Sequence, residues 1–130
     1  MARPPIPEQF VAVLERANPA VMATVRPDGS PVSVATWYLW DDGRVLLNMD
    51  AGRKRLEHLR ADPRVSLTVL DDENWGRHVS LQGTVTLSDD PDLNGIDRLA
   101  RQYGLEEYPV RDRPRMDAWM SVDAYHAWGF

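Results

Sequence analysis

Three consecutive basic residues, Arg53, Lys54 and Arg55, carry the strongest chemical signal in this sequence. Apolar residues three apart, followed by Asp62 before a proline, predict a short helix over residues 52–61, with the basic residues in its first turn. Positive side chains are disfavoured there, because a helix N-terminus already carries free N–H groups and the positive end of the helix dipole. A bound phosphate would reverse this effect, since each charge-assisted hydrogen bond contributes roughly 1.5–3 kcal/mol. The pattern therefore predicts a phosphate site.

The alternative is a solvated charged face in which these side chains pair partly with Glu57. The whole chain is acidic, with 20 acidic and 15 basic residues and a formal net charge of −5, which disfavours nucleic acids and anionic membranes as partners. Residues 53–64 nevertheless hold five basic and two acidic residues. Because screening confines exposed charges to about 8 Å at physiological salt, this basic segment can attract a small anion whatever the net charge is.

A second candidate group stands at the start of the strand expected over residues 78–87. Trp75, Arg77 and His78 bring together an indole, a guanidinium and an imidazole, which could edge a planar ligand by stacking and charge. An ordinary junction between a loop and a strand explains the same three residues and is the simpler interpretation.

Several other kinds of chemistry lack support. The chain has no cysteine, which removes disulfides, thiolate metal sites and cysteine nucleophiles. The glycine-rich dinucleotide motif, the P-loop, H-E-x-x-H and G-x-S-x-G are all absent. His58, His78 and His126 are scattered, so no metal site is expected. The N-terminal residues do not resemble a secretory signal, and no apolar run approaches about 20 residues, so we expect a cytoplasmic protein.

The apolar periodicity predicts a mainly β protein with helices. Helices are expected over residues 7–18, 52–61 and 90–104. Strands are expected over residues 20–26, 31–40, 44–50, 65–69 and 78–87, with one or two more over 115–128. Tight turns between the strands predict antiparallel pairing and exclude a doubly wound parallel sheet. We therefore expect one domain, residues 1–130, that forms a small β-barrel decorated by helices, in the α+β class.

Two of these elements carry finer expectations. The strand over 31–40 has apolar residues on both faces, so we expect both faces to be covered, by a barrel interior and by a helix or a second subunit. The helix over 90–104 is expected to start with Asp90 as its N-cap and Pro91 as its first residue.

The order of these elements, together with the residues along them, resembles the pyridoxamine 5'-phosphate oxidase-like split β-barrel superfamily. The matching stretches are 23–31 (ATVRPDGSP), 37–41 (WYLWD), 53–55 (RKR), 62–66 (DPRVS) and 77–78 (RH), with Gly83. More narrowly, the chain is similar to the flavin/deazaflavin oxidoreductase B group, which includes reductases that depend on the deazaflavin coenzyme F420. The resemblance extends from about residue 8 to residue 129.

This resemblance implies a homodimer that binds a flavin or deazaflavin in a groove between its subunits. The run Arg53–Arg55 would clamp the cofactor phosphate. Arg77 of the other subunit would reach the same cofactor, with Trp75 and His78 beside it. The residues near the ring system or its ribityl chain would be Val32, Val34, Thr36 and Asn48. Two positions depart from the family pattern, because arginine stands at position 55 where lysine is usual and histidine at position 58 where asparagine is frequent.

The implied activity is that of an oxidoreductase that uses reduced coenzyme F420 to transfer hydride to a small unsaturated or conjugated substrate. The cofactor would carry the chemistry, which agrees with the lack of a recognisable catalytic dyad. A proton would come from solvent, Tyr38 or His78. The alternatives are an FMN-dependent reductase or oxidase of the same fold, a non-catalytic protein that binds a flavin or deazaflavin, and a structural dimer whose arginines only pair with acidic segments.

Overall fold

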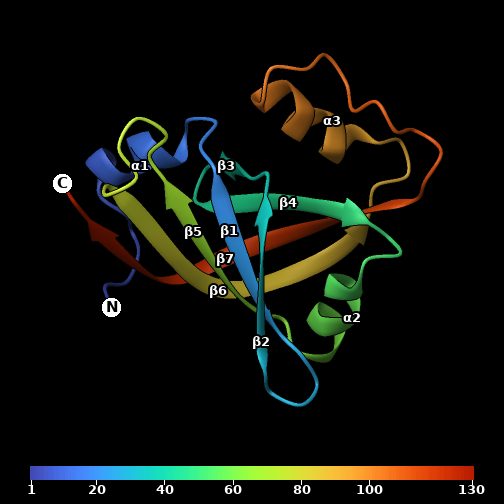
Figure 1. Ribbon diagram of the computed structural model, residues 1–130, viewed down its shortest axis with the longest axis horizontal. Coiled ribbons are helices and arrows are strands. Elements are labelled where there is room, and N and C mark those ends of the chain that lie inside the picture. Colours follow the sequence, from blue (N-terminus) through green and yellow to red (C-terminus); the bar gives the residue numbers. More distant parts are fainter.

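A seven-stranded antiparallel sheet frames the protein in the computed structural model, which describes residues 1–130 (Figure 1). The strands are β1 (Ala20–Val25), β2 (Pro31–Thr36), β3 (Leu39–Asp41), β4 (Arg44–Asp50), β5 (Arg64–Leu70), β6 (His78–Asp89) and β7 (Arg115–Trp128). The helices are α1 (Glu8–Leu14), α2 (Lys54–Ala61) and α3 (Asn94–Gln102). None of them has the length and apolar character that a membrane span requires. The strand order is β2-β1-β5-β6-β7-β4-β3, so the expected α+β class with an antiparallel sheet is confirmed.

The two longest strands, β6 and β7, run through the middle of the sheet and pair over most of their length. The pairing register shifts between Gln82 and Gly83, which forms a β-bulge that bends the sheet. Gly83 is required at this point, because a Cβ atom there would overlap the backbone carbonyl oxygen of Ser121. The segment 115–128, expected as one or two strands, is one continuous strand that carries the extra residue of the bulge, Asp123.

The main apolar core lies on one face of the sheet, and α2 packs against it. Along β5, Val65, Leu67 and Val69 are buried, whereas the residues between them are only half-buried. This is the period-2 pattern of a strand with one buried face. Leu56 and Leu59 of α2 are buried in the same core. Because full burial of a leucine side chain contributes about 1.5–3 kcal/mol, these two residues hold α2 firmly against the sheet.

The strand expected over residues 31–40 is broken into β2 and β3. Tyr38, at the break, is buried, and its hydroxyl group donates to the carbonyl oxygen of Arg16 over 2.8 Å. Trp37 stacks on Tyr103, with ring centroids 5.1 Å apart. Burial of Tyr38 and the stacking of Trp37 on Tyr103 accompany the break after β2, which lies at the edge of the sheet and is largely exposed. No helix of the same chain covers β2, so its expected cover by a second subunit stays a prediction.

Helix α3 begins later than expected. Leu93 takes a left-handed conformation, with φ of 62°, and the helix starts at Asn94 instead of Pro91. Asp90 still caps the helix, because its carboxylate oxygens accept hydrogen bonds from the N–H groups of Gly95 and Ile96, each over 3.0 Å. The sequence thus identified the capping residue, but the helix starts four residues after Asp90 instead of immediately after it.

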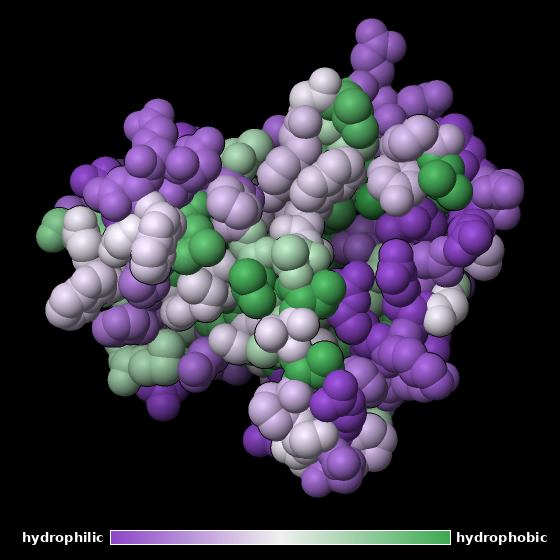
Figure 2. Space-filling view, viewed as in Figure 1, coloured by the Kyte–Doolittle hydropathy of each residue, from purple (hydrophilic) through white to green (hydrophobic).

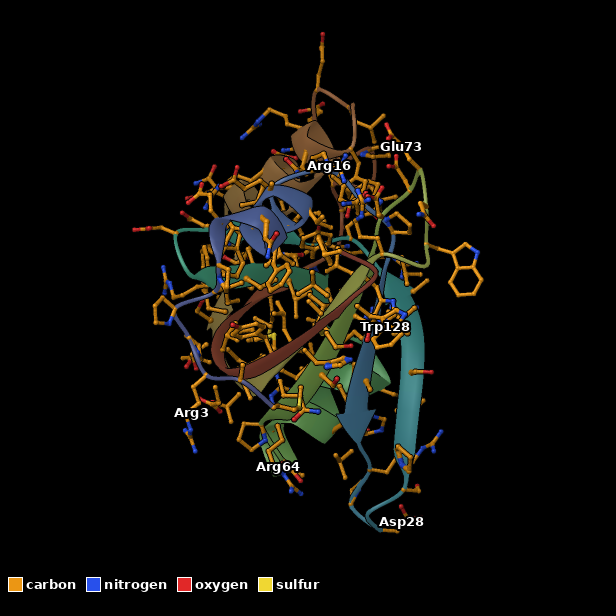
Figure 3. All side chains as sticks on the ribbon, turned by 90° about the vertical axis from the view of Figure 1, so that its left-hand side faces the viewer. Arg3, Arg16, Asp28, Arg64, Glu73 and Trp128 are labelled. Atoms are coloured by element: carbon orange, nitrogen blue, oxygen red, sulfur yellow. The ribbon has the colours of Figure 1, made fainter.

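A buried carboxylate ties together the end of the sheet that lies near α1. Asp71 accepts a hydrogen bond from the Glu73 N–H group over 3.0 Å and pairs with Arg16 at 3.1 Å and Arg77 at 3.6 Å. The Glu73 N–H group, Arg16 and Arg77 hold the pKa of Asp71 below its ordinary value, although burial acts in the opposite direction. Figure 3 shows Arg16 and Glu73 at this end of the molecule, with Asp28 at the far tip of the β1–β2 hairpin.

The bulge predicts a large effect for Gly83→Ala. We expect this change to lower the free energy of unfolding by about 2–3 kcal/mol, because the added methyl group overlaps the Ser121 carbonyl oxygen. Urea-induced unfolding followed by circular dichroism measures the difference. Gly76→Ala is the matched control, since this loop glycine is exposed and the atom nearest to its Cβ position is the movable Asn74 side-chain oxygen at 3.2 Å. Equal stabilities of the two variants would contradict the role of the bulge.

Asp71 predicts a specific pH dependence. A carboxylate whose pKa is lowered in the folded state stabilises the fold above its unfolded-state pKa, and this contribution is lost as the pH falls through the folded-state value. Asp71→Asn should therefore melt well below the wild type at pH 7, and the difference in Tm should narrow as the pH falls below about 4. Thermal melts over a pH series test this. Asp112→Asn, at an exposed residue without an ion pair, is the control, and a constant difference for Asp71→Asn would be the contrary result.

Candidate functional site

The first turn of α2 leaves backbone donors free at its positive end. Arg53 is the N-cap residue, in an extended conformation, and no side chain caps the helix. The N–H groups of Lys54 and Arg55 make no hydrogen bond within the chain. The predicted helix is therefore present, with the basic residues at its N-terminus, and its first N–H groups are free to bind an anion.

Arg55 is a half-buried cation without a carboxylate partner. Its Nη1 atom lies 3.8 Å from the sulfur atom of Met22. Arg53, Arg55 and Arg115 take part in none of the ion pairs of the chain. Burial, followed by the positive charges of Arg53 and Arg115, lowers the pKa of Arg55. The protein thus holds partly desolvated positive charges together with no carboxylate in ion-pair contact with them, and the one acid whose charge reaches Arg115, Asp50, pairs directly with Arg113.

Lys54 behaves differently from its two neighbours in the sequence. Its Nζ atom lies 3.7 Å from a Glu57 carboxylate oxygen, and its side chain is 84% exposed. An exposed pair of this kind contributes about 0–1 kcal/mol. The alternative interpretation of the basic run, a solvated face paired with Glu57, therefore describes Lys54 and does not describe the two arginines.

Arg115 joins the arginines of α2 from a distant part of the sequence. It is the first residue of β7, opposite Asp50 at the end of β4. Its Nε donates to Asn48 Oδ1 over 2.8 Å, and its Cζ lies 4.7 Å from the centre of the Tyr108 ring. Sequence reasoning missed this residue because nothing in its local spacing marks it. Only the pairing of β4 with β7 brings it to α2.

The β2 edge strand borders these cations with an apolar strip. The side chains expected near a ring system, Val32, Val34 and Thr36, share one face of β2. They pair with alternate residues of β1, among them Met22, whose sulfur atom Arg55 contacts. Figure 2 shows apolar side chains over β2 beside hydrophilic side chains over α2. A molecule with a flat ring and a phosphate group would match both surfaces.

The second candidate group lies at the opposite end of the sheet. Arg77 pairs with Asp71, Trp75 is 75% exposed, and Nδ1 of His78 is buried without a hydrogen-bond partner. The loop that carries these residues into β6 lies beside α1, whereas α2 lies at the other end of the molecule (Figure 1). One chain therefore does not bring Arg77 to the basic run, and a site that uses both groups needs a second copy.

The side chain of Asn48 is engaged within the protein, so its expected place near a ring system stays a prediction. This residue is 7% exposed, and its Nδ2 donates to Asp90 over 3.0 Å and to Asp117 over 2.7 Å, while its Oδ1 accepts from Arg115. Burial raises the pKa of Asp117, and the charge of Asp90 acts in the same direction. Both amide hydrogens are used within the protein, so this side chain supports Arg115 and has no donor left for a ring system.

Tyr38, which the sequence analysis named as one possible proton donor, is unsuited to that role. Its side chain is completely buried, and its hydroxyl group donates to the Arg16 carbonyl oxygen. Burial, followed by the nearby Tyr103, raises the pKa of Tyr38 above its ordinary value. This hydroxyl group holds α1 in place and does not reach the face that carries Arg55.

These features define a class of protein: a bent antiparallel sheet with helices, in which one helix presents unpaired arginines beside an exposed edge strand. The family model described as pyridoxamine 5'-phosphate oxidase matches residues 6–129. The chain therefore belongs to the pyridoxamine 5'-phosphate oxidase family, and the resemblance stated from the sequence is confirmed.

Solved structures give the same picture of the fold. A protein named F420 reductase is 28% identical, with a TM-score of 0.83, over 93% of this chain and 98% of that one. A conserved hypothetical protein from Mycobacterium tuberculosis is 24% identical, with a TM-score of 0.77, over 98% and 88% of the two chains. HutZ, the heme storage protein from Vibrio cholerae, is 13% identical, with a TM-score of 0.68, over 100% and 97%. The last two similarities concern the fold alone.

The unpaired charge of Arg55 predicts that it destabilises the protein when no anion is bound. We expect Arg55→Met to raise the Tm of the ligand-free protein by about 2 °C, because it keeps the apolar contact with Met22 and removes a partly buried charge. Differential scanning calorimetry in a buffer without phosphate measures this. Arg64→Met is the matched control, since exposed Arg64 bonds to Asp62 at 2.7 Å and should not gain stability. A fall in Tm for Arg55→Met would argue against an uncompensated charge.

Proposed function

We propose that this protein is an oxidoreductase that binds a phosphorylated flavin-type cofactor, with Arg53 and Arg55 holding the phosphate. The observation that carries the proposal is the half-buried Arg55 guanidinium group, which has two positive neighbours and no carboxylate partner. Each charge-assisted hydrogen bond to a phosphate contributes roughly 1.5–3 kcal/mol, and a guanidinium group can offer two parallel donors. The free N–H groups of the first turn of α2 add further donors at the same place.

The deazaflavin coenzyme F420 is the cofactor that we favour, and FMN is the alternative. The favoured choice is supported by 28% identity to a protein named F420 reductase, over nearly the full length of both chains. The basic residues themselves do not separate the two cofactors, because both carry phosphate. Val32, Val34 and Thr36 would then face the ring system or the chain that links it to the phosphate.

A second copy of the chain is part of this proposal. Two surface cavities, about 600 and 630 Å³ in volume, are lined by other segments and include none of the basic run. In a homodimer, Arg77 of the second copy, with its Trp75 and His78, would close the cofactor groove over the exposed face of β2. Exclusion of water from such a groove strengthens the electrostatic contacts that hold the phosphate.

The chain's own residues would bind and orient, and the cofactor would supply hydride to a small unsaturated or conjugated substrate. The arginines fix the phosphate end, so the ring takes one position along β2. The Tyr108 ring, which packs on Arg115 and lies edge-on to Trp37 with centroids 6.1 Å apart, would limit the space near the site. With Tyr38 buried, a proton would come from solvent or from His78 of the second copy.

Titration with coenzyme F420, FMN and FAD tests the proposal. We expect the deazaflavin to be bound most tightly, and Arg53→Ala and Arg55→Ala to weaken its binding by about 10- to 100-fold each. Lys54→Ala should change the affinity by less than about threefold, because its side chain is exposed and paired with Glu57. Arg64→Ala, which removes a cation already paired with Asp62, is the matched control. Cofactor fluorescence or absorbance reports each titration.

The outcomes separate the alternatives. Micromolar binding of FMN alone would replace the deazaflavin with FMN. Binding without any acceptor that speeds oxidation of the reduced cofactor would leave a protein that stores or shields it. Unchanged affinity in both arginine variants would show that the phosphate clamp is wrongly assigned.

A further inference from the structure

The α2 site has a third guanidinium group available to it. We propose that Arg115 binds the same anion as Arg53 and Arg55, and that Asn48 is the positioning residue that directs Arg115 to it. This inference rests on the anion site of the proposed function. It adds one anion-binding residue that lies outside the basic run, and it gives a role to the polar side chains of Asn48, Asp90 and Asp117 next to Arg115.

The backbone places Arg115 beside the segment that leads into α2. In the β4–β7 pair it lies opposite Asp50, and the Ala51 N–H group donates to the Pro114 carbonyl oxygen over 2.9 Å. The Arg53 N–H group in turn donates to the Asp50 carbonyl oxygen over 3.0 Å. The start of β7, the turn and the N-cap of α2 are thus tied together by hydrogen bonds. The lowered pKa of Arg55, caused in part by Arg115, agrees with this closeness.

The guanidinium group of Arg115 is held at one edge and left free at the other. Its Nε donates to Asn48 Oδ1 over 2.8 Å, and the Tyr108 ring packs on it at 4.7 Å. Neither Nη atom makes a hydrogen bond within the chain, and no carboxylate lies within ion-pair distance. A side chain that is fixed in this way loses little conformational entropy when an anion binds to its free edge.

The orientation of Asn48 follows from its neighbours. Asp90 and Asp117 both accept from its Nδ2, at 3.0 and 2.7 Å, so its Oδ1 must face Arg115. The two carboxylates stand behind the amide, where Asp90 also caps α3 through the N–H groups of Gly95 and Ile96. The amide therefore separates Arg115 from two carboxylates that would otherwise neutralise it. The cross-strand acid Asp50, whose pKa the charge of Arg115 helps to lower, pairs directly with Arg113, so the free edge of Arg115 stays available to an external anion.

The neighbouring Arg113 shows the contrast. It lies two residues before Arg115 and pairs with Asp50 at 3.2 Å, with its side chain 66% exposed. Arg113 therefore has a carboxylate in ion-pair contact and Arg115 has none, and the proposal depends on this difference.

Binding of inorganic pyrophosphate, measured by isothermal titration calorimetry, tests the proposal without any cofactor. We expect Arg115→Gln to weaken this binding by about 10- to 30-fold, and Arg115→Lys to weaken it less, since it keeps the charge and loses the hydrogen bond to Asn48. Arg113→Gln is the matched control and should stay within about twofold of the wild type. As a second probe, FMN should lose affinity in Arg115→Gln, whereas riboflavin, which lacks the phosphate, should not. Circular dichroism checks that each variant is folded.

Asn48→Asp tests the positioning role through its pH profile. A carboxylate at position 48 would pair with Arg115 and repel the anion. The charged groups around it would be Asp90 before α3, Asp117 and Arg115 on β7, and Arg98 of α3, whose charge acts on Asp117. We expect its pyrophosphate affinity, relative to the wild type at each pH, to recover as the pH falls from about 8 to 5, because a protonated carboxyl group resembles the amide. A merely structural role would give a ratio that does not change with pH.

Each outcome decides a claim. Wild-type affinity in folded Arg115→Gln would overturn the role of Arg115, and a flat ratio for Asn48→Asp would overturn that of Asn48. If pyrophosphate binds and is weakened by Arg115→Gln while no flavin or deazaflavin binds, the inference stands and the proposed function fails. If the wild type binds neither pyrophosphate nor any of the cofactors, both are overturned.

Discussion

The packing of α2 against β1 is the interaction on which the candidate site depends. Leu56 and Leu59 anchor the helix in the core, and His58 adds a 3.2 Å contact with the Thr24 hydroxyl group. This anchoring holds the stem of Arg55 against Met22 and keeps its charge close to that of Arg53. On a free helix the same side chains would move apart into water. The burial of two leucines therefore supplies the energy that keeps like charges together.

The distribution of charge matters more here than its total. In an acidic chain most arginines find carboxylates, as Arg16 and Arg77 do with Asp71 and Arg64 does with Asp62. At the N-terminus of α2 the opposite holds: Asp50 is engaged by Arg113 and the Gly52 N–H group, and Asp90 and Asp117 accept from the Asn48 amide. Because exposed charges are screened within about 8 Å, this local imbalance decides which ligands the surface attracts.

The fold alone leaves the ligand open. A protein named F420 reductase and a heme storage protein share this architecture with the chain, so architecture does not choose between their ligands. The choice is made by side chains: unpaired guanidinium groups and an exposed apolar strand on one face of the hairpin, and an indole, a guanidinium and an imidazole at the far end. That the two groups lie at opposite ends of one chain is a constraint on any function that uses both.

The sequence by itself determined the local features of this protein. Alternation in segments such as 65–69, the tight turns between strands, and the helix with basic residues in its first turn depend on neighbouring residues, so they could be predicted without the fold. Tertiary structure decided the rest. Arg115 joins the site only through the pairing of β4 with β7. The side chain of Asn48 donates its hydrogen bonds to carboxylates 42 and 69 residues away, so that its oxygen atom faces Arg115. The strand expected over 31–40 breaks where two aromatic side chains contact distant partners, Tyr38 at Arg16 and Trp37 at Tyr103. Contacts of this kind depend on which distant segments pack together in the fold, and local sequence patterns do not specify that packing.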